Sequence, residues 1–149
     1  MAARTSGAAG YSGRPLPTKL GIKEGFALGV VNEPPELREL LGELPASVQL
    51  RSGIGGDPDI VVLFMTERAR FAEELPRAGE AIFPGGAIWV AWPKRASKVP
   101  TDITEDTVRE LGLPMGLVDN KVCAISDIWS GLRLVWRKEL RGADAPPKR

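Results

Sequence analysis

Hydrophobic and polar positions along the chain alternate in blocks that predict strands and helices in turn. Three blocks are apolar over five or six consecutive residues and predict strands: 26–31, 60–64 and 87–92. The block at 60–64 is typical of a central parallel strand that is covered on both faces. Apolar residues at helical spacing follow the first two blocks. Pro35 suits the first turn of the first of these helices. The second presents one face from Phe71 to Ile82, and Pro76 is expected to break or kink it near its end.

The rest of the chain completes the same architecture. A short strand is predicted at 48–50, and a short helix is expected to be capped by Thr104 and to end near Gly112. Two closing strands are predicted at 117–125 and 132–137. The connection between them is too short for a parallel crossover, so they should be antiparallel. The fold class is therefore α/β: a three-layer sandwich with a mostly parallel, Rossmann-like sheet that ends in an antiparallel strand pair.

Length, charge and composition limit the possible classes of protein. The 149 residues are predicted to form one domain at 11–141, between a disordered arm at 1–10 and a disordered tail at 142–149. Twenty Lys and Arg against 19 Asp and Glu leave no overall field that would attract nucleic acid, and no apolar run is long enough for a membrane span. The single cysteine, Cys123, fits a reducing, cytoplasmic setting. Because the chain has no histidine, a Ser–His triad, a Cys–His pair and a histidine-based zinc site are excluded, and no metal site is predicted.

The turn after the first predicted strand departs from what such a fold normally carries. In β/α folds that bind nucleotides this turn is rich in glycine, so that backbone N–H groups can approach a phosphate or a ribose. Here it reads Asn32-Glu33-Pro34-Pro35, and the two prolines remove two backbone donors and add bulk. The turn argues against the usual cofactor, so no cofactor is predicted.

The predicted topology resembles the later half of a class I methyltransferase fold. The resemblance rests on the closing strand pair and on Pro84-Gly85-Gly86, which leads into a central strand. It implies, as an alternative function, a reduced enzyme that uses S-adenosylmethionine. Enzymes of that family place an acid for the ribose hydroxyls at the end of the second strand, where this chain has Leu50-Arg51-Ser52. That position and the proline turn both argue against the alternative.

Several stretches of the chain form a combination that is more specific than any one of them. They are Tyr11-Ser12-Gly13 with Pro15-Leu16, Lys19-Leu20-Gly21-Ile22-Lys23 with Gly25, Trp89-Val90-Ala91-Trp92-Pro93-Lys94, Thr101-Asp102-Ile103-Thr104, Gly116 to Ile125, and Trp129-Ser130-Gly131-Leu132-Arg133. Together they resemble a small bacterial family known only as domain of unknown function three-zero-five-two, over roughly residues 11–137. The resemblance implies a stand-alone cytoplasmic bacterial domain, with no activity, cofactor or catalytic residue to carry over.

Candidate ligand-binding residues follow from the rule that ligands of open parallel sheets bind beyond the carboxyl ends of the strands. Asn32 can offer its amide to a ligand or bond its own turn. Thr66 can face a ligand or cap the helix that follows it. The Trp92 indole can stack on a planar ligand while Lys94 meets a phosphate or carboxylate. Alternatively, Trp89 and Trp92 pack in the core on opposite faces of the sheet and Lys94 is solvated.

The closing strands supply further candidates. Alternation puts Asp119, Lys121 and Cys123 on one face, where Asp119 and Lys121 form either an acid–base pair or a simple ion pair. Cys123 is expected to be a buried, inert thiol. Trp129 and Ser130 are predicted to lie in a turn, in which Trp129 either fills the core or faces a partner.

These features favour a non-catalytic module that binds a small anionic ligand or a protein partner. The predicted ligand-binding residues are Asn32, Thr66, Trp92, Lys94, Lys121, Trp129 and Ser130, and no catalytic residue is predicted. If the N-terminal segment folds near the rim, five cations are enough to form an anion-binding patch there: Lys19, Lys23, Lys94, Arg95 and Lys98. A nucleic-acid-associated protein that uses the basic loop at 93–100 is a third hypothesis, which the balanced charge disfavours. No membrane partner is expected.

Overall fold

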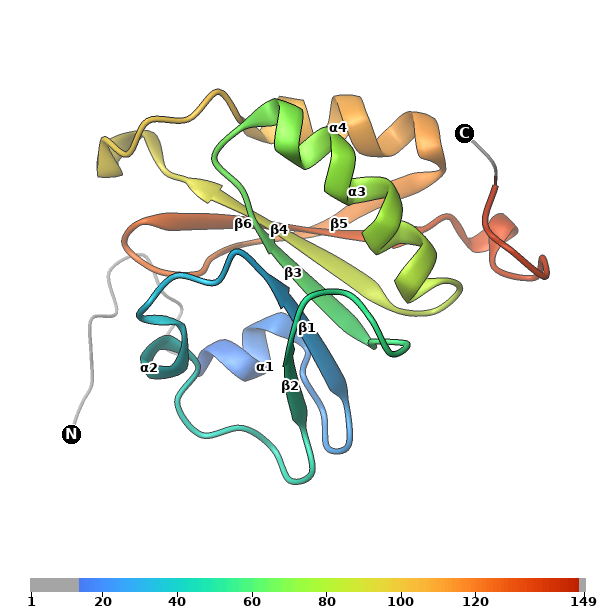
Figure 1. Cartoon of the computed structure of the whole chain (residues 1–149), viewed down its shortest axis with the longest axis horizontal. Helices are drawn as coiled ribbons and strands as arrows, with labels where there is room; N and C mark the ends of the chain where they lie inside the picture. The colour runs from blue at the N-terminus through green and yellow to red at the C-terminus, as the bar shows by residue number, and fades with distance from the viewer. Residues whose placement is uncertain (1–13, 148–149) are drawn as a thin grey trace.

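A computed structural model describes residues 14–147, so the predicted arm at 1–10 and the last two residues of the predicted tail lie outside the described range. One six-stranded sheet has the order β2-β1-β3-β4-β6-β5 (Figure 1). Strands β1 to β4 are parallel, whereas β6 is antiparallel to both of its neighbours. The strands are β1 Ala27–Val31, β2 Gln49–Ser52, β3 Ile60–Phe64, β4 Ala87–Pro93, β5 Leu117–Ala124 and β6 Trp129–Trp136.

Helices cover both faces of the sheet, which confirms the predicted three-layer α/β class (Figure 1). Helices α3 (Arg68–Ile82) and α4 (Glu105–Gly112) pack on one face, the α3–α4 face. The short helices α1 (Leu16–Leu20) and α2 (Leu37–Leu41) pack on the other, the α1–α2 face. Short 3-10 turns are η2 Arg95–Ser97, η3 Leu113–Met115 and η4 Lys138–Leu140. Among these helices of residues 14–147, none has the length and apolar character needed to cross a membrane.

The predicted break at Pro76 is wrong, because α3 continues as one helix to Ile82. Proline removes one backbone hydrogen bond of the helix and normally favours a break there. Buried side chains on both sides of Pro76 nevertheless pack into the same cluster on the α3–α4 face, including Phe71, Leu75 and Ala78. Packing of this apolar stripe therefore outweighs the local effect of the proline.

The connection from β2 to β3 crosses β1 without a helix, because β1 lies between those two strands in the sheet. Gly29 makes room for the crossing, since a Cβ there would lie 2.5 Å from the carbonyl oxygen of Gly53. Arg51 holds the same connection. Its guanidinium donates to the carbonyl oxygen of Gly56 at 2.8 Å and to the side-chain oxygen of Gln49. Arg51 therefore has a structural role at the end of the second strand.

The start of α3 is capped from a distant loop. The prediction that the Thr66 side chain caps this helix is wrong: the helix starts at Arg68, and Glu67 occupies the cap position without a side-chain bond. Instead, Asp102 Oδ1 accepts a hydrogen bond from the backbone N–H of Arg68 at 2.6 Å. The Thr101 hydroxyl donates to the carbonyl oxygen of Thr66 at 2.6 Å, which fixes this loop at the end of β3.

Asp102→Ala should lower the free energy of unfolding by about 1 kcal/mol, because it removes an acceptor and a negative charge from the first turn of α3. Asp102→Asn should keep most of that stability, since the amide oxygen can accept the same hydrogen bond. Urea unfolding of the three proteins measures both differences. An alanine variant as stable as the wild type would show that this contact does not stabilise α3.

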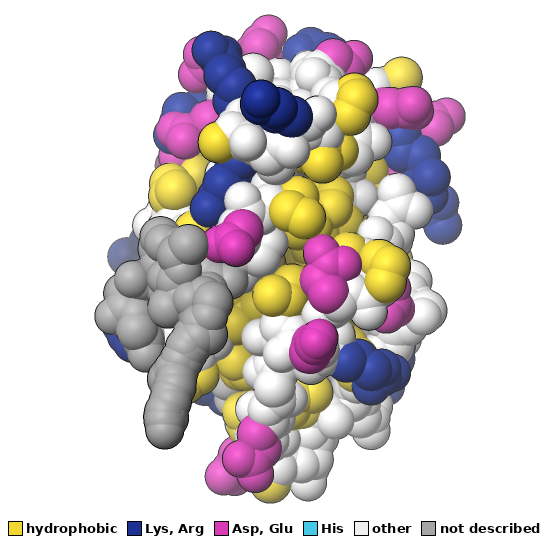
Figure 2. Space-filling model, turned by 90° about the vertical axis from the view of Figure 1, so that its left-hand side faces the viewer, with side chains coloured by type: hydrophobic (Ala, Val, Ile, Leu, Met, Phe, Trp, Pro, Cys, Tyr) yellow, Lys and Arg dark blue, Asp and Glu magenta, His cyan; other side chains and the backbone are white. Residues whose placement is uncertain are grey.

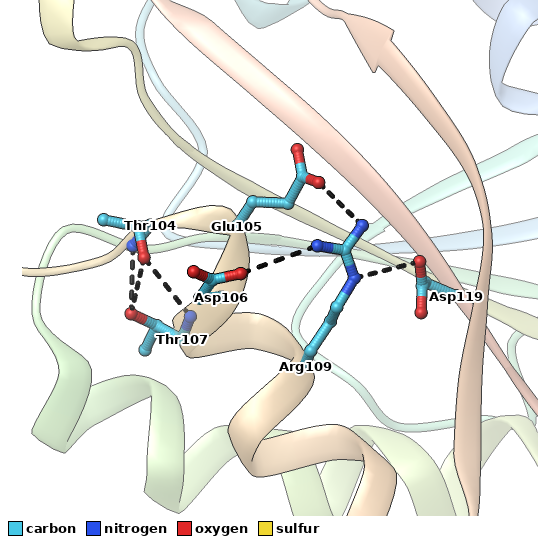
Figure 3. A network of polar contacts seen from close by, with 6 residues as sticks. All are labelled: Thr104, Glu105, Asp106, Thr107, Arg109 and Asp119. Atoms are coloured by element: carbon cyan, nitrogen blue, oxygen red, sulfur yellow. Dashed lines mark hydrogen bonds and ion pairs between the residues drawn. The ribbon is translucent and has the colours of Figure 1, made fainter.

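A polar network joins α4 to β5 (Figure 3). The predicted cap of α4 is confirmed, because Thr104 Oγ1 accepts a hydrogen bond from the backbone N–H of Thr107 at 3.3 Å. Arg109 bridges the two elements: its guanidinium lies 2.6 Å from Glu105 on its own helix and 3.2 Å from Asp119 on β5. Hydrogen bonds to these two carboxylates raise the pKa of Arg109. The network anchors Asp119 on the α3–α4 face.

Candidate functional site

The rim at the carboxyl ends of the parallel strands begins with the turn after β1. Asn32 is exposed there and has a left-handed backbone with φ of 62°, a conformation that asparagine tolerates. Pro34 is buried, and its carbonyl oxygen accepts a hydrogen bond from the N–H of Leu37 at 3.1 Å. Figure 2 looks onto this rim and shows hydrophobic side chains along a hollow with acidic side chains beside it, while Lys and Arg lie around the border. In this view the positive side chains therefore lie outside the hollow.

The two tryptophans of β4 lie on opposite faces of the sheet, as their spacing predicts. Trp92 is 7% exposed and packs into the cluster on the α3–α4 face. Trp89 is fully buried on the α1–α2 face, and its indole N–H donates to the carbonyl oxygen of Leu20 at 3.0 Å. Both indoles thus contribute to the core, and Trp89 attaches α1 to the sheet.

Trp129 and Ser130 belong to β6, so the prediction that they form a turn is wrong. They extend the antiparallel ladder, in which Trp129 lies opposite Pro93 and Ser130 opposite Trp92. The Trp129 ring meets Phe64 edge to face, with centroids 5.1 Å apart. Its indole nitrogen is buried and has no hydrogen-bond partner within residues 14–147. Consecutive residues of a strand point to opposite faces, so Trp129 and Ser130 do not line one site together.

A bulge in β5 separates two residues that simple alternation places on the same face. The pairing with β6 shifts register between Asp119 and Lys121, so Asn120 is an extra residue. Asp119 lies opposite Leu134 and faces α4, whereas Lys121 lies opposite Arg133 on the α1–α2 face. The predicted pair between Asp119 and Lys121 is therefore wrong. The bulge frees Lys121 to join a different set of side chains.

Three side chains form a row across the sheet on the α1–α2 face. Trp89 in β4 lies opposite Arg133 in β6, which in turn lies opposite Lys121 in β5. Residues directly opposite each other on neighbouring strands point to the same face. The row therefore places Arg133 next to the indole that anchors α1, and Lys121 one strand further along the sheet.

A cavity of about 400 Å³ lies beside this row. Its described lining contains three cations and no carboxylate, and consists of Arg14, Lys19, Trp89, Lys121, Val122, Cys123 and Ala124. Lys19 reaches it from α1, is only 9% exposed, and donates from Nζ to the carbonyl oxygen of Ala124 at 2.8 Å. We call Arg14, Lys19 and Lys121 the basic face.

The charges around this cavity influence one another. Burial lowers the pKa of Lys19; Cys123 opposes this shift, and the positive charges of Lys94 and Arg14 add to it. Cys123 is half-buried rather than buried. Burial raises the pKa of its thiol, against the effect of Lys19 and Lys121, so the thiol is protonated at neutral pH. The cavity thus combines net positive charge with a neutral thiol.

The structure brings together only part of the predicted site. Lys121 lines the cavity, and the charge of Lys94 acts on Lys19, whereas Asn32 and Thr66 lie at the ends of β1 and β3. Arg14 and Arg133 were missed. Arg133 was visible in the sequence as a charged residue inside an apolar run, at a position where alternation turns it away from Leu132, Leu134 and Trp136.

Comparison with known proteins adds evidence on the fold. No protein family model matches the chain, and no curated protein matches it. A SAM dependent methyltransferase from Aquifex aeolicus superposes with a TM-score of 0.51 and 15% identity, over 78% of this chain and 85% of that one. A protein of the NADB-Rossmann superfamily from Streptococcus agalactiae has a TM-score of 0.51 and 10% identity, over 83% of this chain and 68% of that one. At these identities the likeness shows the fold alone, which is Rossmann-like.

Proposed function

We propose that this protein is a non-catalytic α/β module that binds a small anionic ligand on its basic face. The observation that carries the proposal is the convergence of Arg14, Lys19 and Lys121 around one cavity whose described lining contains no carboxylate. Burial costs Lys19 part of its hydration, and an anion in the cavity would interact favourably with Lys19 and with the exposed Arg14 and Lys121.

The lining also indicates the shape of the ligand. Val122 and Ala124 contribute apolar surface to the same lining. A ligand that carries a carboxylate or phosphate on an apolar body matches this combination better than a simple inorganic ion does. We therefore expect organic anions to bind more tightly than phosphate of equal charge.

Lys121→Gln should weaken the binding of citrate or ADP roughly fivefold to tenfold, because one charge pair at contact contributes about 1 kcal/mol in water. Isothermal titration calorimetry at two salt concentrations measures the change, and higher salt should weaken binding to the wild type. Lys138→Gln is the matched control, since Lys138 is exposed on η4 and lines no part of this cavity. If phosphate, citrate and ADP all fail to bind at millimolar concentration, the proposal loses its support.

Cys123 provides an independent probe of the potential in the cavity. The chain has one cysteine, so a thiol reagent reports on this position alone. We expect the ratio of modification rates for anionic over cationic methanethiosulfonate reagents to fall about three- to tenfold in Lys121→Gln, because the variant loses one nearby charge. Both rates should rise with pH, since the raised pKa of Cys123 leaves little thiolate at neutral pH. An unchanged ratio would show that Lys121 does not shape the field at the thiol.

A reduced S-adenosylmethionine-dependent enzyme is the alternative, and the fold shared with the Aquifex aeolicus methyltransferase supports considering it. Three features of this chain weigh against it. The turn after β1 contains Pro34 and Pro35, Arg51 is used to hold the β2–β3 connection, and that connection passes closely over Gly29. Calorimetry with the cofactor separates the two proposals: affinity tighter than about 0.1 mM would favour the enzyme.

Other parts of the proposal extend beyond the site itself. We also propose that the protein is related to domain of unknown function three-zero-five-two and acts in the cytoplasm. A protein partner is the other occupant that we consider, and the hydrophobic hollow at the strand ends would be its contact surface (Figure 2). Substitutions on the basic face should leave such a partner bound, which distinguishes the two surfaces.

A further inference from the structure

Arg133 is a half-buried cation near the centre of the row across the sheet. Its side chain forms no hydrogen bond and no ion pair with any residue between 14 and 147. Burial lowers its pKa, and the one charge that adds to the shift is the like charge of Arg141. A guanidinium that is partly removed from water without a counter-charge costs free energy, so this position favours a bound anion.

Arg133 also lines a second cavity, of about 580 Å³, at the amino ends of the parallel strands. Lys23 lines the same cavity and adds a second cation. Two carboxylates lie in its wall, but Asp59 accepts a hydrogen bond from the backbone N–H of Ala27 at 2.8 Å, and neither Asp57 nor Asp59 contributes to the pKa shift of Arg133. The cavity wall therefore does not supply the partner of this arginine.

Residues that are direct neighbours in the sheet line the two cavities. Trp89 and Lys121 line the first cavity and are the direct neighbours of Arg133, which lines the second. Cys123 also lines the first cavity. It lies opposite Gly131, and Gly131 is two residues before Arg133 on β6. Lys121 and Arg133 lie directly opposite each other on β5 and β6, so one cation of each cavity is a cross-strand neighbour of a cation of the other. A short chain of linked anionic groups can therefore reach both.

Resting on the proposed function, we infer that the ligand of the basic face carries two separated anionic groups, as linked phosphates do. One group binds between Lys19 and Lys121, and the second binds Arg133. Lysine acts as a point charge for phosphate, while the planar fork of arginine binds two oxygens of one group. Arg133 therefore selects extended anions over compact ones.

The test compares inorganic phosphate with tripolyphosphate by isothermal titration calorimetry of the full chain. The wild type should bind tripolyphosphate at least about tenfold more tightly than phosphate. Arg133→Gln should reduce that preference to about threefold or less and leave the affinity for phosphate unchanged, whereas Arg133→Lys should retain part of the preference. Arg141→Gln removes a nearby positive charge that lines neither cavity, and it should leave the preference unchanged.

The outcomes separate this inference from the proposed function. If phosphate binding depends on Lys121 but Arg133→Gln keeps the full preference for tripolyphosphate, the two-group ligand is overturned and the proposed function stands. A preference that falls equally in Arg141→Gln would also overturn it, because a general positive field would then explain the effect. If neither anion binds, the proposed function fails as well. Circular dichroism of each variant confirms that the compared proteins are folded.

Discussion

Trp89→Ala is expected to lower the free energy of unfolding by about 3–5 kcal/mol and to weaken anion binding on the basic face. The indole is fully buried, so its removal leaves a cavity between α1 and the sheet. It also leaves the carbonyl oxygen of Leu20 without its donor, which adds the cost of an unpaired buried acceptor. Because α1 carries Lys19, the loss of this contact should displace one of the cations that line the first cavity.

Trp136→Ala is the matched control for this prediction. Trp136 is 1% exposed on the opposite face of the sheet, and its indole N–H donates to the carbonyl oxygen of Gly79 at 2.9 Å. This variant should lose comparable stability but keep its affinity for anions. Urea unfolding and calorimetry at low temperature measure both quantities, and Trp89→Phe replaces Trp89→Ala if the latter does not fold. Equal losses of affinity on both faces would mean that binding follows overall stability and not the position of Trp89.

Gly29→Ala should lower the free energy of unfolding by about 1–3 kcal/mol through overpacking. The added Cβ would lie 2.5 Å from the carbonyl oxygen of Gly53, a backbone atom that cannot rotate away. The N–H of Gly53 donates to the carbonyl oxygen of Val30 at 2.7 Å, which holds the β2–β3 connection against β1. The substitution must therefore either shift this connection or break that hydrogen bond.

Gly55→Ala provides the comparison within the same connection. A Cβ at Gly55 meets nothing within 4 Å, and its backbone is outside the left-handed region, so alanine should be neutral or slightly stabilising. Thermal and urea unfolding of the two variants measure the difference. If Gly29→Ala is as stable as Gly55→Ala, the connection does not press on β1 as closely as the structure indicates.

Elements that depend on local patterns were predictable from the sequence. The continuous apolar run at 60–64 corresponds to β3 without any error in its bounds, and the cap at Thr104 starts α4 as expected. Trp89 and Trp92 face opposite sides because they are three residues apart on a strand. In each case the deciding interaction lies within a few residues of the chain, so the local sequence contains the necessary information.

Features that depend on contacts between distant parts of the chain could not be predicted from the local sequence. The cap of α3 comes from Asp102, which accepts a hydrogen bond from the backbone N–H of Arg68, 34 residues away in the chain. Helix α3 passes through Pro76 because buried neighbours on both sides outweigh the proline. The bulge at Asn120 is defined only by the pairing of β5 with β6, and no residue type marks it in the sequence.

The same division applies to the candidate site. The sequence by itself determined the available chemistry: abundant lysine and arginine, one thiol, no histidine, and a proline turn where nucleotide-binding folds have glycine. Only the tertiary structure decided which cations meet. Strand β6 inserts between β4 and β5, which sets Arg133 beside Trp89 and Lys121, and α1 brings Lys19 to a carbonyl group 105 residues away. Side-chain charge is a local property, whereas a binding site requires charges to converge, and convergence follows from strand order, register and packing.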